Sequence, residues 1–177
     1  LLGEIGVGKT SIARRLVFGR FQADYNPTLG VDIFRYEVAA TATTPAQTLI
    51  IWDTDGNMGE AIFRHVYVRQ AAAALCICDA SRPETAETMM KLAEGFMAAL
   101  PGRHCHLIIN KIDLVADAEN EPHLPALARF RLPTTRTSAL TGRNIVHAFQ
   151  DTAAAIAREA GIAWESLAAS FKEQKDG

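Results

Sequence analysis

The feature that most constrains this chain of 177 residues is the octet Gly3-Glu4-Ile5-Gly6-Val7-Gly8-Lys9-Thr10, which has the form G-x-x-x-x-G-K-T. Its glycines let backbone N–H groups turn inward around phosphate oxygens, its lysine reaches the terminal phosphates, and its threonine hydroxyl is a Mg²⁺ ligand. Residues 10–18 follow with apolar side chains at helical spacing, so the positive end of a helix dipole points at the same phosphates. The octet therefore predicts a strand–loop–helix unit that binds a phosphorylated ligand.

Only Leu1 and Leu2 precede the octet, where a strand of about five residues is expected. The chain has no initiator methionine, so we expect the first strand to be truncated and the chain to be a fragment of a longer protein. Because this strand is central in the predicted sheet, we also expect its truncation to destabilise the domain.

The composition indicates one globular domain and excludes some partners. A formal net charge of −2 gives no basic bias toward nucleic acid, and the longest apolar stretches fall well short of a membrane span. Cys76 and Cys78 lie in an apolar run, as expected of buried thiols in a reduced, cytoplasmic protein. His104 and His106 form a pair without a third ligand nearby, so we expect no metal there.

Strands and helices alternate along the chain, which predicts an α/β fold with a doubly wound, mostly parallel sheet. Apolar runs predict strands at 31–38, 48–53, 72–79, 104–110 and 132–137, and helical periodicity predicts helices at 10–18, 84–100, 121–130 and 141–159, the last ending near Gly161. A Thr/Ala/Pro turn joins the first two of these strands into a hairpin. In such sheets the ligand lies at the carboxyl ends of the strands, where the motifs described next also fall.

Two further motifs complete the predicted ligand site. Asp53-Thr54-Asp55-Gly56 follows a hydrophobic strand and supplies a carboxylate for the Mg²⁺ shell and a glycine whose N–H is open to a phosphate oxygen. In Asn110-Lys111-Ile112-Asp113, the last carboxylate accepts two parallel N–H donors, which guanine presents and adenine does not. Thr137-Ser138-Ala139 closes the base pocket, with the Ala139 N–H facing the base oxygen. These motifs predict a guanine nucleotide and disfavour an ATP-using enzyme.

With these motifs, the chain resembles the Ras-superfamily small GTPases, closest to the Rab type, over residues 1 to about 160. The resemblance extends to Phe21-Gln22-Ala23-Asp24-Tyr25-Asn26-Pro27-Thr28-Leu29-Gly30-Val31-Asp32 and to Trp52 before the Asp53 motif. It implies the three-layer α/β fold of P-loop NTPases, with a mostly parallel six-stranded sheet, one antiparallel edge hairpin strand and helices on both faces. It also implies GTP or GDP with Mg²⁺ as ligands. Effectors, exchange factors and activators would bind two switch loops, 25–30 and 53–69, that the γ-phosphate orders.

The resemblance also implies a role for each matching residue. The nucleotide-binding residues would be Gly3, Glu4, Ile5, Gly6, Val7, Gly8, Lys9, Thr10, Ser11, Phe21, Tyr25, Thr28, Gly56, Asn110, Lys111, Asp113, Ser138, Ala139 and Leu140. The Mg²⁺ ligands would be Thr10, Thr28 and Asp53. The catalytic residues would be Lys9, Thr28, Gly56 and Asn57.

Three positions near the hydrolytic centre depart from the family pattern. Asn57 stands where the family usually has the glutamine that orients the attacking water, and its side chain is one methylene shorter. Asp55 replaces a usual alanine and adds negative charge beside a triphosphate, and Ile5 is bulky where an activator's arginine would enter. We therefore expect slow intrinsic hydrolysis and a weak response to such an activator, with neutral drift and compensation as the alternative. Leu140 replaces a usual lysine beside the base, which is a smaller loss.

Three interpretations of the whole chain remain open. The first is a switch that hydrolyses GTP, the second is a non-hydrolysing GTP/GDP-binding module, and the third is a regulatory domain of a larger protein. Residues 1–160 form the predicted GTPase domain, and residues 161–177 form a helical extension that we expect to pack on it. Because the chain ends without a C-terminal cysteine, we expect no intrinsic membrane anchor. We expect a cytoplasmic monomer that binds no nucleic acid.

Overall fold

The computed structural model describes residues 1–21, 30–42, 44–56, 66–115 and 131–173. Its elements are, in chain order, β1 (Leu2–Gly3), α1 (Lys9–Phe18), β2 (Val31–Val38), β3 (Gln47–Thr54), α2 (Val66–Arg69), β4 (Ala73–Asp79), α3 (Thr85–Ala99), β5 (His104–Asn110), a 3₁₀ turn (Ile112–Leu114), β6 (Thr134–Arg136) and α5 (Ile145–Glu173). No helix in this part of the chain is long and apolar enough to cross a membrane.

The strands form a parallel sheet and a separate hairpin. The sheet has the order β1-β4-β5-β6, and β2 pairs with β3 in antiparallel register. The predicted α/β fold is thereby confirmed, but the single six-stranded sheet is not seen. The hairpin contacts Leu1, directly before β1: the Leu1 N–H donates to the Trp52 carbonyl (2.6 Å) and the Thr54 hydroxyl donates to the Leu1 carbonyl (2.7 Å).

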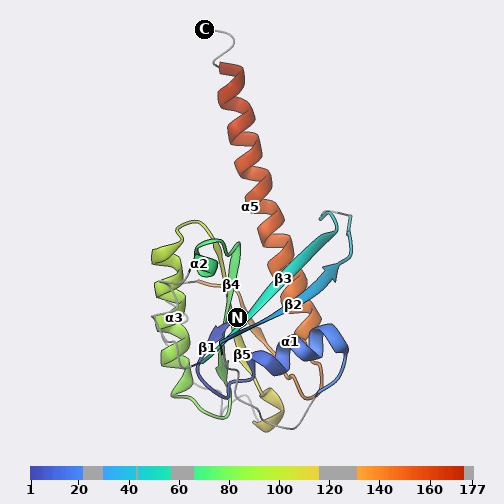
Figure 1. Ribbon diagram of the computed structural model, residues 1–177, viewed down its shortest axis with the longest axis vertical. Helices are drawn as coiled ribbons and strands as arrows, with labels where there is room; N and C mark the ends of the chain where they lie inside the picture. Colours follow the sequence, from blue (N-terminus) through green and yellow to red (C-terminus); the bar gives the residue numbers. More distant parts are fainter. Residues whose placement is uncertain (22–29, 43, 57–65, 116–130, 174–177) are drawn as a thin grey trace.

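Both faces of the parallel sheet are covered by helices, and this explains why β4 and β5 are continuous apolar runs. On one face, α3 buries Met89 and Phe96 against Cys76 and Leu107. On the other face, α1 and α5 contribute a second buried cluster that includes Ile12, Leu16, Ile77, Ile108 and Phe149. Figure 1 shows α3 on one side of the sheet and α1 with α5 on the other. The three cysteines are free and buried, as predicted for Cys76 and Cys78.

Helix α5 departs from the prediction. It does not end near Gly161 but continues to Glu173, for 29 residues in all. A glycine inside a helix costs only about 1 kcal/mol relative to alanine, and no proline follows it, so the helix propagates through the position. Figure 1 shows the C-terminal half of α5 extending away from the sheet, where the sequence had suggested a segment packed on its own domain. The predicted helix at 121–130 lies outside the described residues.

Candidate functional site

The loop between β1 and α1 lies at the carboxyl edge of the parallel sheet, where the ends of β4, β5 and β6 also meet. Gly6 and Gly8 have positive φ angles of 76° and 100°, which glycine adopts at little cost. A Cβ atom on Gly8 would collide with the side-chain amide nitrogen of Asn110. The loop therefore needs glycine at position 8 both for its backbone angles and for its close approach to β5.

Lys9 is the first residue of α1, and its side chain is buried beneath this loop. Its ammonium donates to the carbonyls of Gly3 (2.9 Å) and Glu4 (3.0 Å). Burial lowers the pKa of Lys9, while the negative charges of Asp53, Asp55 and Glu4 oppose that shift. The lysine thus places a buried positive charge at the centre of the loop, as the octet predicts.

Asp53, at the carboxyl end of β3, faces the start of α1. The Thr10 hydroxyl donates to its Oδ2 (2.5 Å), and its Oδ1 is buried without a hydrogen-bond partner among the residues that the structure describes. Burial raises the pKa of Asp53, while the Thr10 hydrogen bond and the positive charges of the Leu1 ammonium and Lys9 oppose the shift. A carboxylate oxygen without a partner beside a hydroxyl is a suitable donor set for Mg²⁺, which prefers oxygen ligands.

Gly56 lies directly against the loop between β1 and α1. A Cβ atom added to it would lie 2.5 Å from the Ile5 backbone nitrogen and 2.8 Å from the Ile5 Cα. The segment after β3 therefore packs on the loop through backbone alone, which only glycine permits.

Asn110, at the end of β5, connects three loops of the site. Its buried side-chain amide donates to the Val7 carbonyl (2.9 Å), and its Oδ1 accepts from the Thr137 hydroxyl (3.1 Å) and the Ala139 N–H (3.2 Å). The Ala139 N–H was expected to face a base oxygen, whereas here it donates to Asn110. The Asn110 side chain thus joins the loop between β1 and α1, which is expected to bind phosphate, to the loop after β6, which is expected to close the base pocket.

Asp113 and Ser138 lie together, as their motifs predict. The Ser138 hydroxyl donates to Asp113 Oδ1 (2.5 Å), and this fixes one oxygen of the carboxylate that is expected to face guanine. Lys111 adopts a left-handed conformation (φ 62°) between β5 and the 3₁₀ turn. Its ammonium lies 2.7 Å from Asp79 Oδ2, and this ion pair fixes the direction of the Lys111 side chain.

Asp79 and Arg82 belong to the site but were missed by sequence reasoning. Asp79 is buried at the end of β4 and accepts hydrogen bonds from the Arg82 guanidinium (3.0 Å) and the Lys111 ammonium. Arg82 also donates to the Ile5 carbonyl (2.9 Å). Burial alone would raise the pKa of Asp79, but the hydrogen bonds from Lys111, Ser81 and Arg82 outweigh it and lower the pKa. The available signal was an aspartate that ends an apolar run at the ligand edge of the sheet.

Arg15, on α1, was also missed. Its guanidinium donates to the carbonyls of Ala139 (2.8 Å), Leu140 and Gly19 (2.9 Å). Nothing in the sequence distinguishes this arginine from Arg14 beside it, because two of its three partners, Ala139 and Leu140, lie more than 120 residues away in the chain.

Several predicted residues lie at the edge of the described region or outside it. Ile5, Phe21 and Leu140 are exposed, with 37%, 38% and 49% of their surface accessible, so the bulky Ile5 side chain is open to an approaching protein. Tyr25, Thr28 and Asn57 lie outside the described residues, as does most of the predicted switch loops 25–30 and 53–69.

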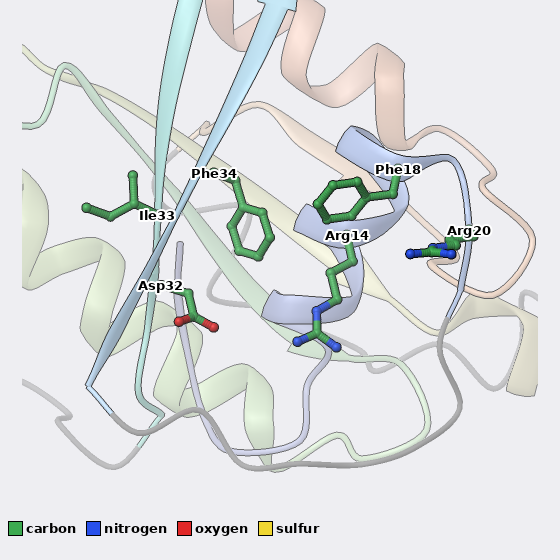
Figure 2. A pocket seen from close by; sticks show the side chains of 6 residues that line it. All are labelled: Arg14, Phe18, Arg20, Asp32, Ile33 and Phe34. Atoms are coloured by element: carbon green, nitrogen blue, oxygen red, sulfur yellow. The ribbon is translucent and has the colours of Figure 1, made fainter.

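A separate hollow of about 390 Å³ lies between α1 and β2. Figure 2 shows Arg14, Phe18 and Arg20 on one side of it and Asp32, Ile33 and Phe34 on the other. The rings of Phe18 and Phe34 pack edge to face with centroids 6.3 Å apart. None of these six residues was assigned to the nucleotide, so this hollow is distinct from the predicted site.

Comparison with known proteins gives a consistent result. The model of the Ras family matches residues 1–158. The chain is 28% identical to Ras-related protein Rab-5B of Plasmodium falciparum over 157 residues (88% of this chain and 75% of that protein) and 29% identical to the Ypt/Rab-type GTPase ypt7 of Schizosaccharomyces pombe over 182 residues (98% and 87%). It is 32% identical to rat Ras-related protein Rab-4B over 154 residues, which cover 84% of this chain and 70% of that protein.

Proposed function

Because the chain belongs to the Ras family of GTP-binding switch proteins, we propose that it binds GTP and GDP with Mg²⁺ and hydrolyses GTP slowly. The observation that carries this proposal is the cluster of Lys9, Thr10 and Asp53, in which one buried carboxylate oxygen has no partner in the described part of the chain. A nucleotide's phosphates and a divalent cation would compensate the buried charges of this cluster.

The proposed roles follow from the contacts around the loop. Thr10 and Asp53, with Thr28 from the first switch, would hold Mg²⁺, which when bound offsets negative charge on the phosphate oxygens. Lys9 would turn its ammonium from the Gly3 and Glu4 carbonyls toward the phosphates. Asp113, fixed by Ser138, would accept the guanine N–H donors.

The remaining nucleotide contacts are carried over from the family pattern. Loop residues Gly3 to Ser11 and Gly56 would surround the phosphates, Phe21 and Lys111 would cover the base, and Ser138, Ala139 and Leu140 would close the pocket behind it. Tyr25 and Thr28 would reach the nucleotide from the first switch.

Slow hydrolysis is proposed from three substitutions around the γ-phosphate position. Asn57 is too short to place its amide on the attacking water as a glutamine does. Asp55 adds a negative charge close enough to Lys9 to oppose the lowering of the lysine's pKa by burial. The exposed Ile5 side chain occupies space that an activator's arginine needs. These changes favour a switch that remains in its GTP state for long periods.

The first test is to denature the purified protein and identify the released nucleotide by ion-exchange chromatography. GDP would support a working hydrolase, retained GTP would favour the non-hydrolysing module, and a released adenine nucleotide would contradict the proposal. Single-turnover hydrolysis then compares the unmodified chain with Asn57→Gln, which we expect to be faster. An equal rate in both would refute the role given to Asn57, and a rate typical of the family in the unmodified chain would refute slow hydrolysis.

The partners proposed are effectors, exchange factors and activators that bind loops 25–30 and 53–69, with the protein acting as a cytoplasmic monomer. The alternative of a non-hydrolysing module, or of a regulatory domain within a larger protein, uses the same binding residues. Asn57, Asp55 and Ile5 favour the non-hydrolysing module, which turnover distinguishes from the switch, whereas the full-length gene would decide on the regulatory domain.

A further inference from the structure

Arg15 makes an unusual set of contacts for a helix side chain. Its three guanidinium nitrogens donate to three different backbone carbonyls: Nε to Ala139 (2.8 Å), Nη1 to Gly19 (2.9 Å) and Nη2 to Leu140. A planar guanidinium can direct several N–H donors at once, whereas a lysine ammonium is a single compact charge on a flexible chain. Arg15 therefore fixes the direction of a loop as well as its distance.

The loop that Arg15 contacts is held by several kinds of interaction. The bonds from the Thr141 N–H to the Ser138 hydroxyl and from the Gly142 N–H to the Ser138 carbonyl close the turn on itself. Ala139 is buried in the apolar cluster that α1 and α5 form with the sheet, and its N–H donates to Asn110, whereas Leu140 is 49% exposed. Arg15 binds the carbonyls of both residues and so fixes the backbone on the exposed side of the loop.

The same loop positions the carboxylate that is expected to read guanine. Ser138, directly before Ala139, donates to Asp113 Oδ1 (2.5 Å). A shift of the Ala139–Leu140 backbone therefore moves the hydroxyl that orients Asp113. On the other side, Gly19, the third acceptor of Arg15, lies two residues before Phe21.

We propose that Arg15 is a positioning residue for base recognition: it fixes the 138–140 loop and, through Ser138, holds Asp113 in the direction that discriminates the guanine 2-amino group. This inference rests on the proposed binding of guanine nucleotides. Arg15 does not touch the base itself, and its effect on specificity is transmitted by the loop.

The test measures dissociation constants for GDP and for IDP, whose hypoxanthine base lacks the 2-amino group. Arg15→Met should weaken GDP binding by about tenfold and reduce the GDP-over-IDP preference at least threefold, since the loss of contacts worth about 1.4 kcal/mol corresponds to a tenfold change in affinity. Arg15→Lys should be intermediate. Arg14→Met is the matched control, because Arg14 is the adjacent arginine on α1 and lines the separate hollow in Figure 2, so both constants should stay unchanged.

A double-mutant cycle with Ser138→Ala locates the path of the effect. If Arg15 acts through Ser138, then Arg15→Met should change the GDP-over-IDP preference little when Ser138 is already alanine. Equal weakening of GDP and IDP by Arg15→Met, with the preference intact, would show a merely structural role and overturn the inference. If Arg15→Met does not fold, Arg15→Lys alone decides by the same ratio.

The outcomes also separate this inference from the proposed function. An unmodified chain that prefers GDP over IDP, with variants that keep that preference, leaves the proposed function standing and overturns only the role of Arg15. An unmodified chain that binds neither nucleotide overturns both.

Discussion

At the scale of single residues, Asn110 shows how the site is held together. Three of its hydrogen bonds reach the Val7 carbonyl, the Thr137 hydroxyl and the Ala139 N–H. Removal of the amide would leave buried backbone groups without partners, and each such group costs about 1–3 kcal/mol. Gly8 also lies against this amide, and its missing side chain makes the approach possible, since an added Cβ atom would lie 2.4 Å from the amide nitrogen.

We expect Gly8→Ala to disable nucleotide binding. The substitution forces alanine into a left-handed conformation and pushes its methyl group into Asn110, for a combined cost of about 2–4 kcal/mol in unfolding free energy. Urea unfolding and fluorescent GDP titration measure the two effects. Gly102→Ala is the control, because Gly102 also has a positive φ (80°) but no atom within 4 Å of the added Cβ. Equal losses in both variants would mean that the contact with Asn110 is unimportant.

The residues found by sequence reasoning are those whose role is encoded in local backbone. Lys9, Thr10, Gly56 and Asn110 each lie where their motif predicts, because a short run of residue types specifies a turn at a strand end. Arg15, Asp79 and Arg82 were not assigned in this way, since their contacts with Ala139, Lys111 and Ile5 are made only in the tertiary fold. Arg15 illustrates the limit: its contact with Ala139 spans 124 positions.

At the scale of elements, the packing of α5 on β5 depends on a buried histidine. His106 lies between the Thr152 hydroxyl (3.0 Å from Nδ1) and the Thr135 hydroxyl (2.9 Å from Nε2). Because Thr152 donates its proton to the Ala148 carbonyl (2.8 Å), Nδ1 must be the donor and Nε2 the acceptor of a neutral ring. Burial, with a contribution from His104, lowers the pKa of His106 to about 4.

We therefore expect stability to fall as the pH drops from about 6.5 to 4. A histidine whose folded pKa is below its unfolded value stabilises the fold only while it is neutral, so this contribution, on the order of 3 kcal/mol, is complete above pH 6.5 and lost toward pH 4. The nearby charged groups are His104, Asp151 and His147, with Glu159 and Arg158 facing His104. Chemical denaturation at several pH values measures the effect.

His106→Gln supplies the comparison, because an amide keeps one donor and one acceptor without titrating. The variant should lose most of the pH dependence between pH 6.5 and 4, whereas His147→Gln, at a side chain that is 65% exposed, should retain it. An unchanged slope in His106→Gln would assign the dependence to other groups.

The continuity of α5 through Gly161 gives a second prediction at this scale. Because no atom lies within 4 Å of a Cβ added at Gly161, Gly161→Ala should stabilise a continuous helix by about 0.5–1 kcal/mol and raise the helical signal in circular dichroism. If the helix instead ended near Gly161, as the sequence predicted, with the glycine in a left-handed conformation, the same change would lower both quantities.

Element types were predictable where burial imposes a strong pattern. The strands β4 and β5 begin and end within about one residue of their expected positions, because runs of apolar residues are unambiguous when both faces are covered. Strand β2, which is largely exposed in the hairpin, also has its expected bounds. The end of α5 was not predictable, because a lone glycine is a weak signal that helix propagation overrides. The division into sheet and hairpin depends on the pairing of β1, which a two-residue strand does not specify.

At the scale of the whole molecule, the two apolar clusters hold the sheet from both faces, and the site lies at the edge where its strands end. The site is thus assembled from loops that are distant in sequence, and it forms only when the sheet does. Binding and folding are therefore linked.

We expect GDP with Mg²⁺ to raise the melting temperature. Ligand at 100 times its dissociation constant adds about 2.7 kcal/mol, which corresponds to about 8 °C for a domain of this size. Differential scanning fluorimetry measures the shift. A chelator should remove most of it, and ADP at the same concentration should produce little. An equal shift with ADP would contradict guanine selectivity.

The length of α5 has a mechanical consequence. The helix is 29 residues long and begins directly after the loop that is expected to close the base pocket. The Ile145 N–H, at its first residue, donates to the Gly142 carbonyl of that loop. At 1.5 Å per residue it spans about 43 Å, so a rotation of about 5° at its base displaces its far end by about 4 Å. A small rearrangement of the loop before α5 is therefore amplified at the C-terminal end of the helix. Two fluorophores, one at that end and one near the loop, could follow the rearrangement as a change in distance.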